Sequence, residues 1–299
     1  LSIPVLPITI MGTAVAFYLG FKNNSAYDRA WEARKIWGAI VNSSRTWGIM
    51  VKDFVTDEYA KDAISEKELK EIHRRLIYRH IAWLYRLKRQ LRAPKVWEHA
   101  YDREHEHQFR KLLKEQFPLE SEEVELANFL ADEEVQELLK MKNVATQLLA
   151  RQSADLRMLK RRGLIDDFRH MELENMLKDF YTQQGKCERI KNYPLPRQYA
   201  TVSVYFVVVF IGLLPMGILT ASKGLPEYMI WGTIPFSMIV GWVFWLMEMV
   251  GDYAENPFEN LAFDTPMYSL TRTIEIDLRE MLGETELPAP IGPINDIVM

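Results

Sequence analysis

The sequence has few of the residues that build disulfides and catalytic centres. Cys187 is the only cysteine among 299 residues, which excludes an internal disulfide. The sequence contains no phosphate-binding glycine loop, no nucleophile elbow and no arrangement with a histidine base. It also lacks the basic start and the cleavage site of a secretory signal peptide. These absences predict a protein that is not an enzyme and that needs no cofactor and no metal.

Charge is missing from three long stretches. Residues 1–21, 199–222 and 228–247 contain no Asp, Glu, Lys or Arg. A helix of about 20 apolar residues is long enough to cross the hydrocarbon core of a bilayer. The sequence therefore predicts an integral membrane protein, in contact with lipid through three helices.

The charged residues divide the chain into four predicted parts. Residues 1–21 form a membrane helix, 22–198 a cytosolic helical region, 199–247 two membrane helices with a short turn, and 248–299 a cytosolic acidic loop, short helix and tail. Region 22–198 has 34 Lys and Arg against 29 Asp and Glu, whereas 248–299 has 2 against 11. Basic residues flank the spans on the side of the large region, which places it in the cytoplasm. Because the chain opens inside an apolar run, we expect a first membrane helix to be missing upstream.

Two stripes run along the first predicted membrane helix. Gly12, Ala16 and Gly20 recur every four residues, and Thr13, Phe17 and Phe21 do the same on the adjacent stripe. Small residues let neighbouring helices pack closely, which makes the first stripe a candidate packing face. Around a shared axis, the second stripe would form stacked rings, and such a hydrophobic neck gates some channels. The alternative is an ordinary packed membrane helix whose phenylalanines face lipid.

The remaining periodicity is helical throughout, which predicts an all-α protein. The first helix should continue through the charged residues that follow Phe21, because no proline interrupts them. An acidic loop is expected at 119–125, and Asp132 is expected to cap a helix that ends at Gly163. Further helices are predicted at 66–92, 168–190 and about 270–282.

Two clusters invite other readings. The basic side of 66–92 suggests nucleic acid, but core-type residues interrupt it and no readout motif accompanies it, so we expect no nucleic-acid partner. His99, His105 and His107 lie close to Glu104 and Glu106 and suggest a metal site. No HExxH motif is present, and an exposed charged helix explains the cluster as well.

Four stretches together resemble the bestrophin family of ion channels, in particular its prokaryotic-type members. They are YLGFKNNSAYDRAWEARKIWG at 18–38, GKCERIKNYPLP at 185–196, ENPFENLAFDTPM at 255–267 and RTIEIDLREMLGE at 272–284. The resemblance implies a homopentamer, in which a four-helix membrane part continues into a large cytosolic helical region around one axial pore.

The resemblance also implies roles for individual residues. Matching the phenylalanine of the family's GF pair to Phe21 makes Phe17 and Thr13 the other neck residues, although Thr13 is more polar than the usual residue there. A second, cytosolic constriction maps onto GLIDDF, with Phe168 as first choice and Ile165 as second.

The same resemblance bears on calcium. Animal members bind calcium partly through a loop with an NPF sequence followed by acidic residues. Here Asn256 and Asp264 remain, but the acidic run is replaced by NLAF. Too few carboxylates are left for a well-coordinated site, so we predict no calcium gating.

Chloride is the expected ion, because aromatic edges are positive and the cytosolic region is net basic. Selectivity for monovalent cations such as sodium is the first alternative, since Glu248 and the acidic tail would serve a cation. A membrane-anchored interaction module is the second, and a metal-dependent membrane enzyme built on the histidine cluster is the third.

Overall fold

The structure is a computed structural model that describes residues 4–98, 121–224, 226, 230–259, 261, 264–293 and 297–298. The regular elements among these residues are all helices, as predicted. Contacts divide the chain into two compact units. Unit 1 comprises Leu1–Glu32 and Asn192–Pro257, and unit 2 comprises Ala33–Lys191 and Phe258–Met299. The histidine cluster at 99–107 lies outside the described residues.

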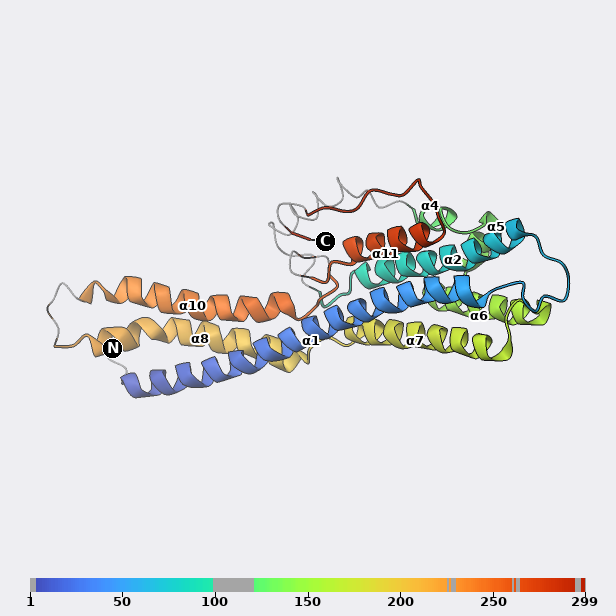
Figure 1. Cartoon of the computed structure of the whole chain (residues 1–299). Coiled ribbons are helices and arrows are strands. Elements are labelled where there is room, and N and C mark those ends of the chain that lie inside the picture. Colours follow the sequence, from blue (N-terminus) through green and yellow to red (C-terminus); the bar gives the residue numbers. More distant parts are fainter. Residues whose placement is uncertain are drawn as a thin grey trace. The chain divides into compact units, whose positions relative to one another are not determined.

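Helix α1 (Val5–Phe54) is continuous over 50 residues and contributes to both units. It therefore runs past Phe21 without a break, as the absence of proline predicted. In unit 1 it joins α8 (Arg197–Ala221) and α10 (Thr233–Ala254), of which the last two lie side by side (Figure 1). All three helices are long and apolar enough to cross a membrane, which agrees with the three predicted spans. The third begins at Thr233, after the predicted start at residue 228, and continues past Met247.

The core of unit 1 is a single seam. Ile8, Val15 and Leu19 of α1 pack with Val207, Phe210 and Leu214 of α8. Partly buried apolar residues of α10 pack against this cluster, and many other large apolar side chains of the three helices stay exposed in the single chain. Helices of membrane proteins have no need to bury their outer apolar faces against their own chain, because lipid and neighbouring helices cover them.

Unit 2 is built around α2 (Glu66–Arg92), whose residues from Leu76 to Lys88 are all buried. It packs against α6 (Val144–Arg162) and α11 (Met267–Met281). Two shorter helices, α4 (Glu122–Ala127) and α5 (Asp132–Leu138), and the long α7 (Asp167–Asn192) complete the unit.

Helix ends in unit 2 follow local capping chemistry. The Ser65 hydroxyl accepts a hydrogen bond from the Glu68 amide at 3.1 Å, and Asp166 accepts one from the Arg169 amide at 2.8 Å. Gly163 ends α6 with a φ of 77°, a left-handed conformation that glycine adopts without strain. The helix starts expected at 66 and 168 and the stop expected at Gly163 agree with these boundaries to within one residue.

Two helix predictions were wrong. The helix expected from Asp132 to Arg162 is interrupted after Leu138, and Asn143 caps a new helix by accepting a hydrogen bond from the Thr146 amide at 3.1 Å. Asp132 is the first helical residue there, not the cap. The acidic segment expected to be a loop forms α4, because the Ser121 hydroxyl caps it and three glutamates favour the positive end of a helix.

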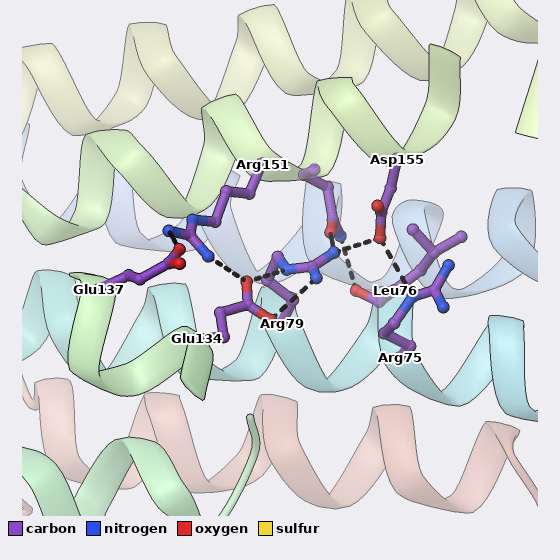
Figure 2. A network of polar contacts seen from close by, with 8 residues as sticks. Arg75, Leu76, Arg79, Glu134, Glu137, Arg151 and Asp155 are labelled. Carbon is purple, nitrogen blue, oxygen red and sulfur yellow. Dashed lines mark hydrogen bonds and ion pairs between the residues drawn. The ribbon is translucent and has the colours of Figure 1, made fainter. Parts of the chain in front are cut away.

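Buried charge in unit 2 is held by a network (Figure 2). Arg79 is only 6% exposed; its guanidinium donates to Glu134 at 2.9 and 3.1 Å and to Asp155 at 2.6 Å. Arg151 binds Glu137 at 2.6 Å and also approaches Glu134. The buried Arg79 therefore has more than one partner, which is the condition under which a buried ion is tolerated.

Candidate ion pathway

The predicted neck residues lie on the exposed face of α1. Phe17 and Phe21 are 68% and 67% exposed in the single chain, and Thr13 is exposed as well. Phe17 is nine positions after Ile8 of the packing seam, which is about two and a half turns of helix. Phe17 therefore points away from the face of α1 that packs on α8.

Phe17 and Phe21 give their stripe an apolar surface, and their rings lie next to each other along the helix. The Phe17 and Phe21 rings have centroids 6.4 Å apart with a tilt of 38°. The hydroxyl of Thr13 donates to the carbonyl of Thr9 at 3.0 Å, so its proton is used within the helix. Such a surface offers an ion little hydration, which is what a hydrophobic constriction requires.

The small residues of α1 do not share one environment. A Cβ on Gly12 would lie 2.8 Å from the Phe210 ring, so this glycine lets α8 approach closely. Ala16 is half-buried, whereas Gly20 is exposed and has nothing within 4 Å of an added Cβ in the described chain. Gly12 thus packs inside the protomer, and packing of Gly20 against another copy stays a prediction.

A buried ion pair directly follows the stripe. Lys22 binds Glu248 of α10, and Ser203 of α8 donates to the same carboxylate oxygen at 2.9 Å. The side chains of Lys22 and Glu248 are 0% and 2% exposed, and Glu248 Oε2 has no hydrogen-bond partner in the described part of the chain. The pair joins all three helices of unit 1 immediately beside Phe21. Glu248 is therefore engaged within the protomer, which counts against its predicted role as a free carboxylate for cations.

Sequence reasoning missed this pair although a signal for it existed. Lys22 is the first charged residue after the first apolar span and Glu248 the first after the third, with opposite signs. Because Lys22 and Glu248 each directly follow the end of a span, they lie at the same depth in a membrane. Charges at that depth are rare unless they are paired.

The two candidates for the cytosolic constriction differ in burial. Phe168, in the first turn of α7, is 82% exposed, whereas Ile165 is 2% exposed and belongs to the core of unit 2. A residue inside the core cannot line a pore, so the second choice is not supported by its position. Phe168 stays a prediction.

The residues of the degenerate calcium loop are already engaged. Asp264 accepts a hydrogen bond from the Leu261 amide at 3.1 Å and lies 3.8 Å from Arg92. Asn256 is buried and donates to Glu255 at 3.4 Å. In the described ranges, no group of three or more His, Cys, Asp or Glu side chains is placed to hold a metal ion. The absence of calcium gating stays a prediction.

Comparison with known proteins identifies the family. Residues 1–280 match the model of the Bacterial/Fungal Bestrophin protein family. The chain belongs to the bestrophin family. The resemblance read from the four sequence stretches is thereby confirmed, and the spans of this bestrophin make it an integral membrane protein.

Relatives and solved structures agree with the family. The voltage-dependent anion channel-forming protein YneE of Escherichia coli is 26% identical over 287 residues, which cover 96% of this bestrophin and 80% of YneE. The voltage-dependent anion channel-forming protein sll1024 of Synechocystis is 24% identical over 94% of the chain and 78% of that protein. The crystal structure of a bacterial bestrophin homologue from Klebsiella pneumoniae superposes with a TM-score of 0.76 at 25% identity, covering 96% of this chain and 90% of that one.

Proposed function

We propose that this bestrophin forms a homopentameric channel that conducts chloride and other small anions through a neck of Thr13, Phe17 and Phe21. The observation that carries the proposal is the exposure of Phe17 and Phe21 on the side of α1 opposite its packing seam. Copies of α1 around an axis would turn these rings inward. The anion-channel names of its relatives support the choice of ion.

The large helical region faces the cytoplasm in this proposal, because basic residues flank the spans on that side. Phe168 forms the second constriction, since its ring is exposed at a helix start in unit 2. No covalent chemistry is involved, and calcium does not gate the channel, because Asp264 is held by Arg92 and by a backbone amide.

The neck is tested by Phe17→Ala, with Phe236→Ala as the matched control. Phe236 is an equally exposed aromatic residue, on α10, with 63% of its surface accessible. Chloride flux into liposomes should rise several-fold in Phe17→Ala, because removing the ring widens the hydrophobic constriction. Phe236→Ala should behave like the parent. Equal flux in all three proteins would remove Phe17 from the pathway.

Ion selectivity is tested separately by reversal potentials in planar bilayers under a salt gradient. Replacing chloride with a large organic anion should shift the reversal potential, whereas replacing sodium should not. The opposite pattern would establish the alternative, a channel for monovalent cations. A complete absence of flux from well-folded protein would favour the membrane-anchored interaction module.

A further inference from the structure

Polar side chains fasten α1 to the other parts of unit 1 at the level of the predicted neck. We call this set the α1 clamp, and its members are Tyr18, Lys22, Asn23 and Arg29. The hydroxyl of Tyr18 donates to the carbonyl of Gln198, in the first turn of α8, at 3.1 Å. Arg29 donates to the carbonyls of Tyr193, before α8, and Glu255, after α10, each at 2.9 Å. The clamp therefore brackets Phe21 on both sides along α1.

The centre of the clamp consists of two consecutive residues that reach α10. Lys22 binds Glu248 and also donates to the Ser203 hydroxyl at 3.2 Å. The amide of Asn23 donates from Nδ2 to the carbonyl of Met247 at 2.9 Å. Two neighbours on α1 thus bind two neighbours on α10, directly after Phe21.

A glycine of α10 leaves the room for this contact. Gly251 is buried, and a Cβ there would lie only 2.2 Å from Oδ1 of Asn23. Glycine inside a helix costs about 0.5–1 kcal/mol relative to alanine. At this position the lack of a side chain lets the Asn23 amide reach the backbone of α10.

The clamp fixes the rotation of α1 about its own axis, which the apolar seam does not. Hydrophobic contact has no direction, so the seam holds α1 against α8 without defining one rotation. Hydrogen bonds weaken steeply when donor and acceptor are misaligned. Because successive residues of a helix point about 100° apart, directing Lys22 and Asn23 toward α10 also sets the direction of Phe21.

We propose that Lys22 and Asn23 are positioning residues of the ion pathway, which set the direction of the Phe21 ring and thereby how strongly the neck discriminates among anions. The inference rests on the proposed neck. A hydrophobic constriction favours ions that lose their water readily, such as iodide over chloride. That preference requires rings that stay in one place, so loosening the clamp should reduce it.

Gly251→Ala tests the clamp from the side of α10. Its methyl group would displace the Asn23 amide, and the variant should fold because the end of that side chain can move. Gly241→Ala is the matched control, since Gly241 is another buried glycine of α10, where a Cβ would make ordinary contact with Ile211 at 3.4 Å. Asn23→Ala removes the same hydrogen bond from the side of α1 and should act in the same direction as Gly251→Ala.

The direction of residue 21 is measured by the rate at which a charged thiol reagent modifies the Phe21→Cys variant of the full chain in liposomes. Cys187 is buried, so the parent gives a low background. Adding Gly251→Ala or Asn23→Ala should change the rate at least threefold, whereas adding Gly241→Ala should leave it unchanged. An unchanged rate with both clamp substitutions would overturn the proposal.

The consequence for ions is measured by the permeability of iodide relative to chloride, from reversal potentials in planar bilayers. The parent should favour iodide, and Gly251→Ala should bring the ratio at least twofold closer to one. In a Phe17→Ala/Phe21→Ala background the same substitution should have no effect, because no ring remains to be positioned. An unchanged ratio in the first case, or an equal shift in both backgrounds, would contradict the positioning role.

The same measurements separate a failure of the clamp from a failure of the neck. If Phe17→Ala/Phe21→Ala alone keeps the parental ratio, the neck assignment and the effect on anions fail together. The thiol rates then still decide whether the clamp orients residue 21.

Discussion

The two units of this bestrophin treat apolar surface and charge in opposite ways. Unit 1 buries one seam of apolar side chains and leaves Phe17, Phe236 and Trp242 more than 60% exposed. Unit 2 buries its large apolar residues, among them Trp47, Trp83 and Phe180, in one continuous core. Among its described residues, unit 2 therefore covers most of its large apolar side chains within the single chain, with Phe168 an exception. Unit 1 depends on lipid and on other helices for the rest of its contacts.

The two units also differ in the number of partners that a buried charge has. In unit 1 the buried Lys22 relies on one carboxylate and one hydroxyl, whereas the buried Arg79 in unit 2 has two carboxylates and a glutamine amide. A low-dielectric setting strengthens a single pair and raises the cost of breaking it. The comparison therefore predicts that losing Lys22 is more damaging than losing Arg79.

The largest effect is expected for Lys22→Met. It leaves Glu248 buried without its cation, which should lower the free energy of unfolding by roughly 3–5 kcal/mol. Lys22→Met/Glu248→Met removes both charges and should recover most of that loss. Tryptophan fluorescence during thermal unfolding in detergent measures both. If the single variant is as stable as the double variant, the pair is not coupled.

Arg79→Met sharpens the comparison between the units. Its partners Glu134 and Asp155 are 16% and 25% exposed and keep Arg151 and Arg75 as neighbours. We expect a loss of about 2–3 kcal/mol, below that of Lys22→Met, because water screens the carboxylates that remain. A larger loss than in Lys22→Met would reverse the proposed difference between the two units.

Much of unit 2 was readable from the sequence because its helix ends use local signals. Ser65, Asp166 and Gly163 each act on residues a few positions away. The break before Asn143 was missed because apolar residues keep a helical spacing across it, and an asparagine inside such a pattern does not by itself mark a cap.

The candidate site was predictable where it depends on one helix and not where it depends on several. Spacing along α1 placed Thr13, Phe17 and Phe21 on one face, and their exposure agrees with a face that does not pack on α8. Contact between Lys22, Ser203 and Glu248 joins three helices and needs the fold. Likewise Phe168 and Ile165 are both apolar in sequence, and only packing separates them.

Protonation provides a probe of unit 2 alone. His80 is buried beside Phe180, and its Nε2–H donates to Ser44 at 2.9 Å, since the Ser44 hydroxyl donates to Ile40. Burial lowers the pKa of His80 to about 3. The unfolded chain takes up a proton near pH 6.5 and the folded chain does not, so stability falls as the pH drops below 6.5.

Between pH 7 and pH 5 the contribution of His80 should amount to about 2 kcal/mol of lost stability. His80→Phe should flatten this dependence, and the difference between the two pH profiles measures it. His73, half-buried and with a pKa that burial also lowers, is the matched control, and His73→Gln should change the profile less. Identical profiles for the parent and His80→Phe would show that the imidazole titrates freely.

The smallest expected effects concern two glycines of α1 and return to the neck. Gly12→Ala places a methyl group 2.8 Å from the Phe210 ring, so overpacking of about 1–3 kcal/mol exceeds the gain in helix propensity of about 0.5–1 kcal/mol. Gly20→Ala meets nothing in the described protomer and should stabilise it by that same gain. The two variants therefore differ in sign if only the protomer matters.

The stability of the oligomer tests separately whether Gly20 packs at the subunit interface. If α1 helices pack against each other around the pore through Gly20, an added methyl group separates them, and Gly20→Ala weakens the oligomer although the protomer gains helix propensity. Size-exclusion chromatography with light scattering on dilution in detergent measures this, with Gly12→Ala as the comparison. If the Gly20→Ala oligomer resists dilution as well as the parent does, Gly20 lies away from the subunit interface, and the case for a shared axis rests on the neck residues Thr13, Phe17 and Phe21.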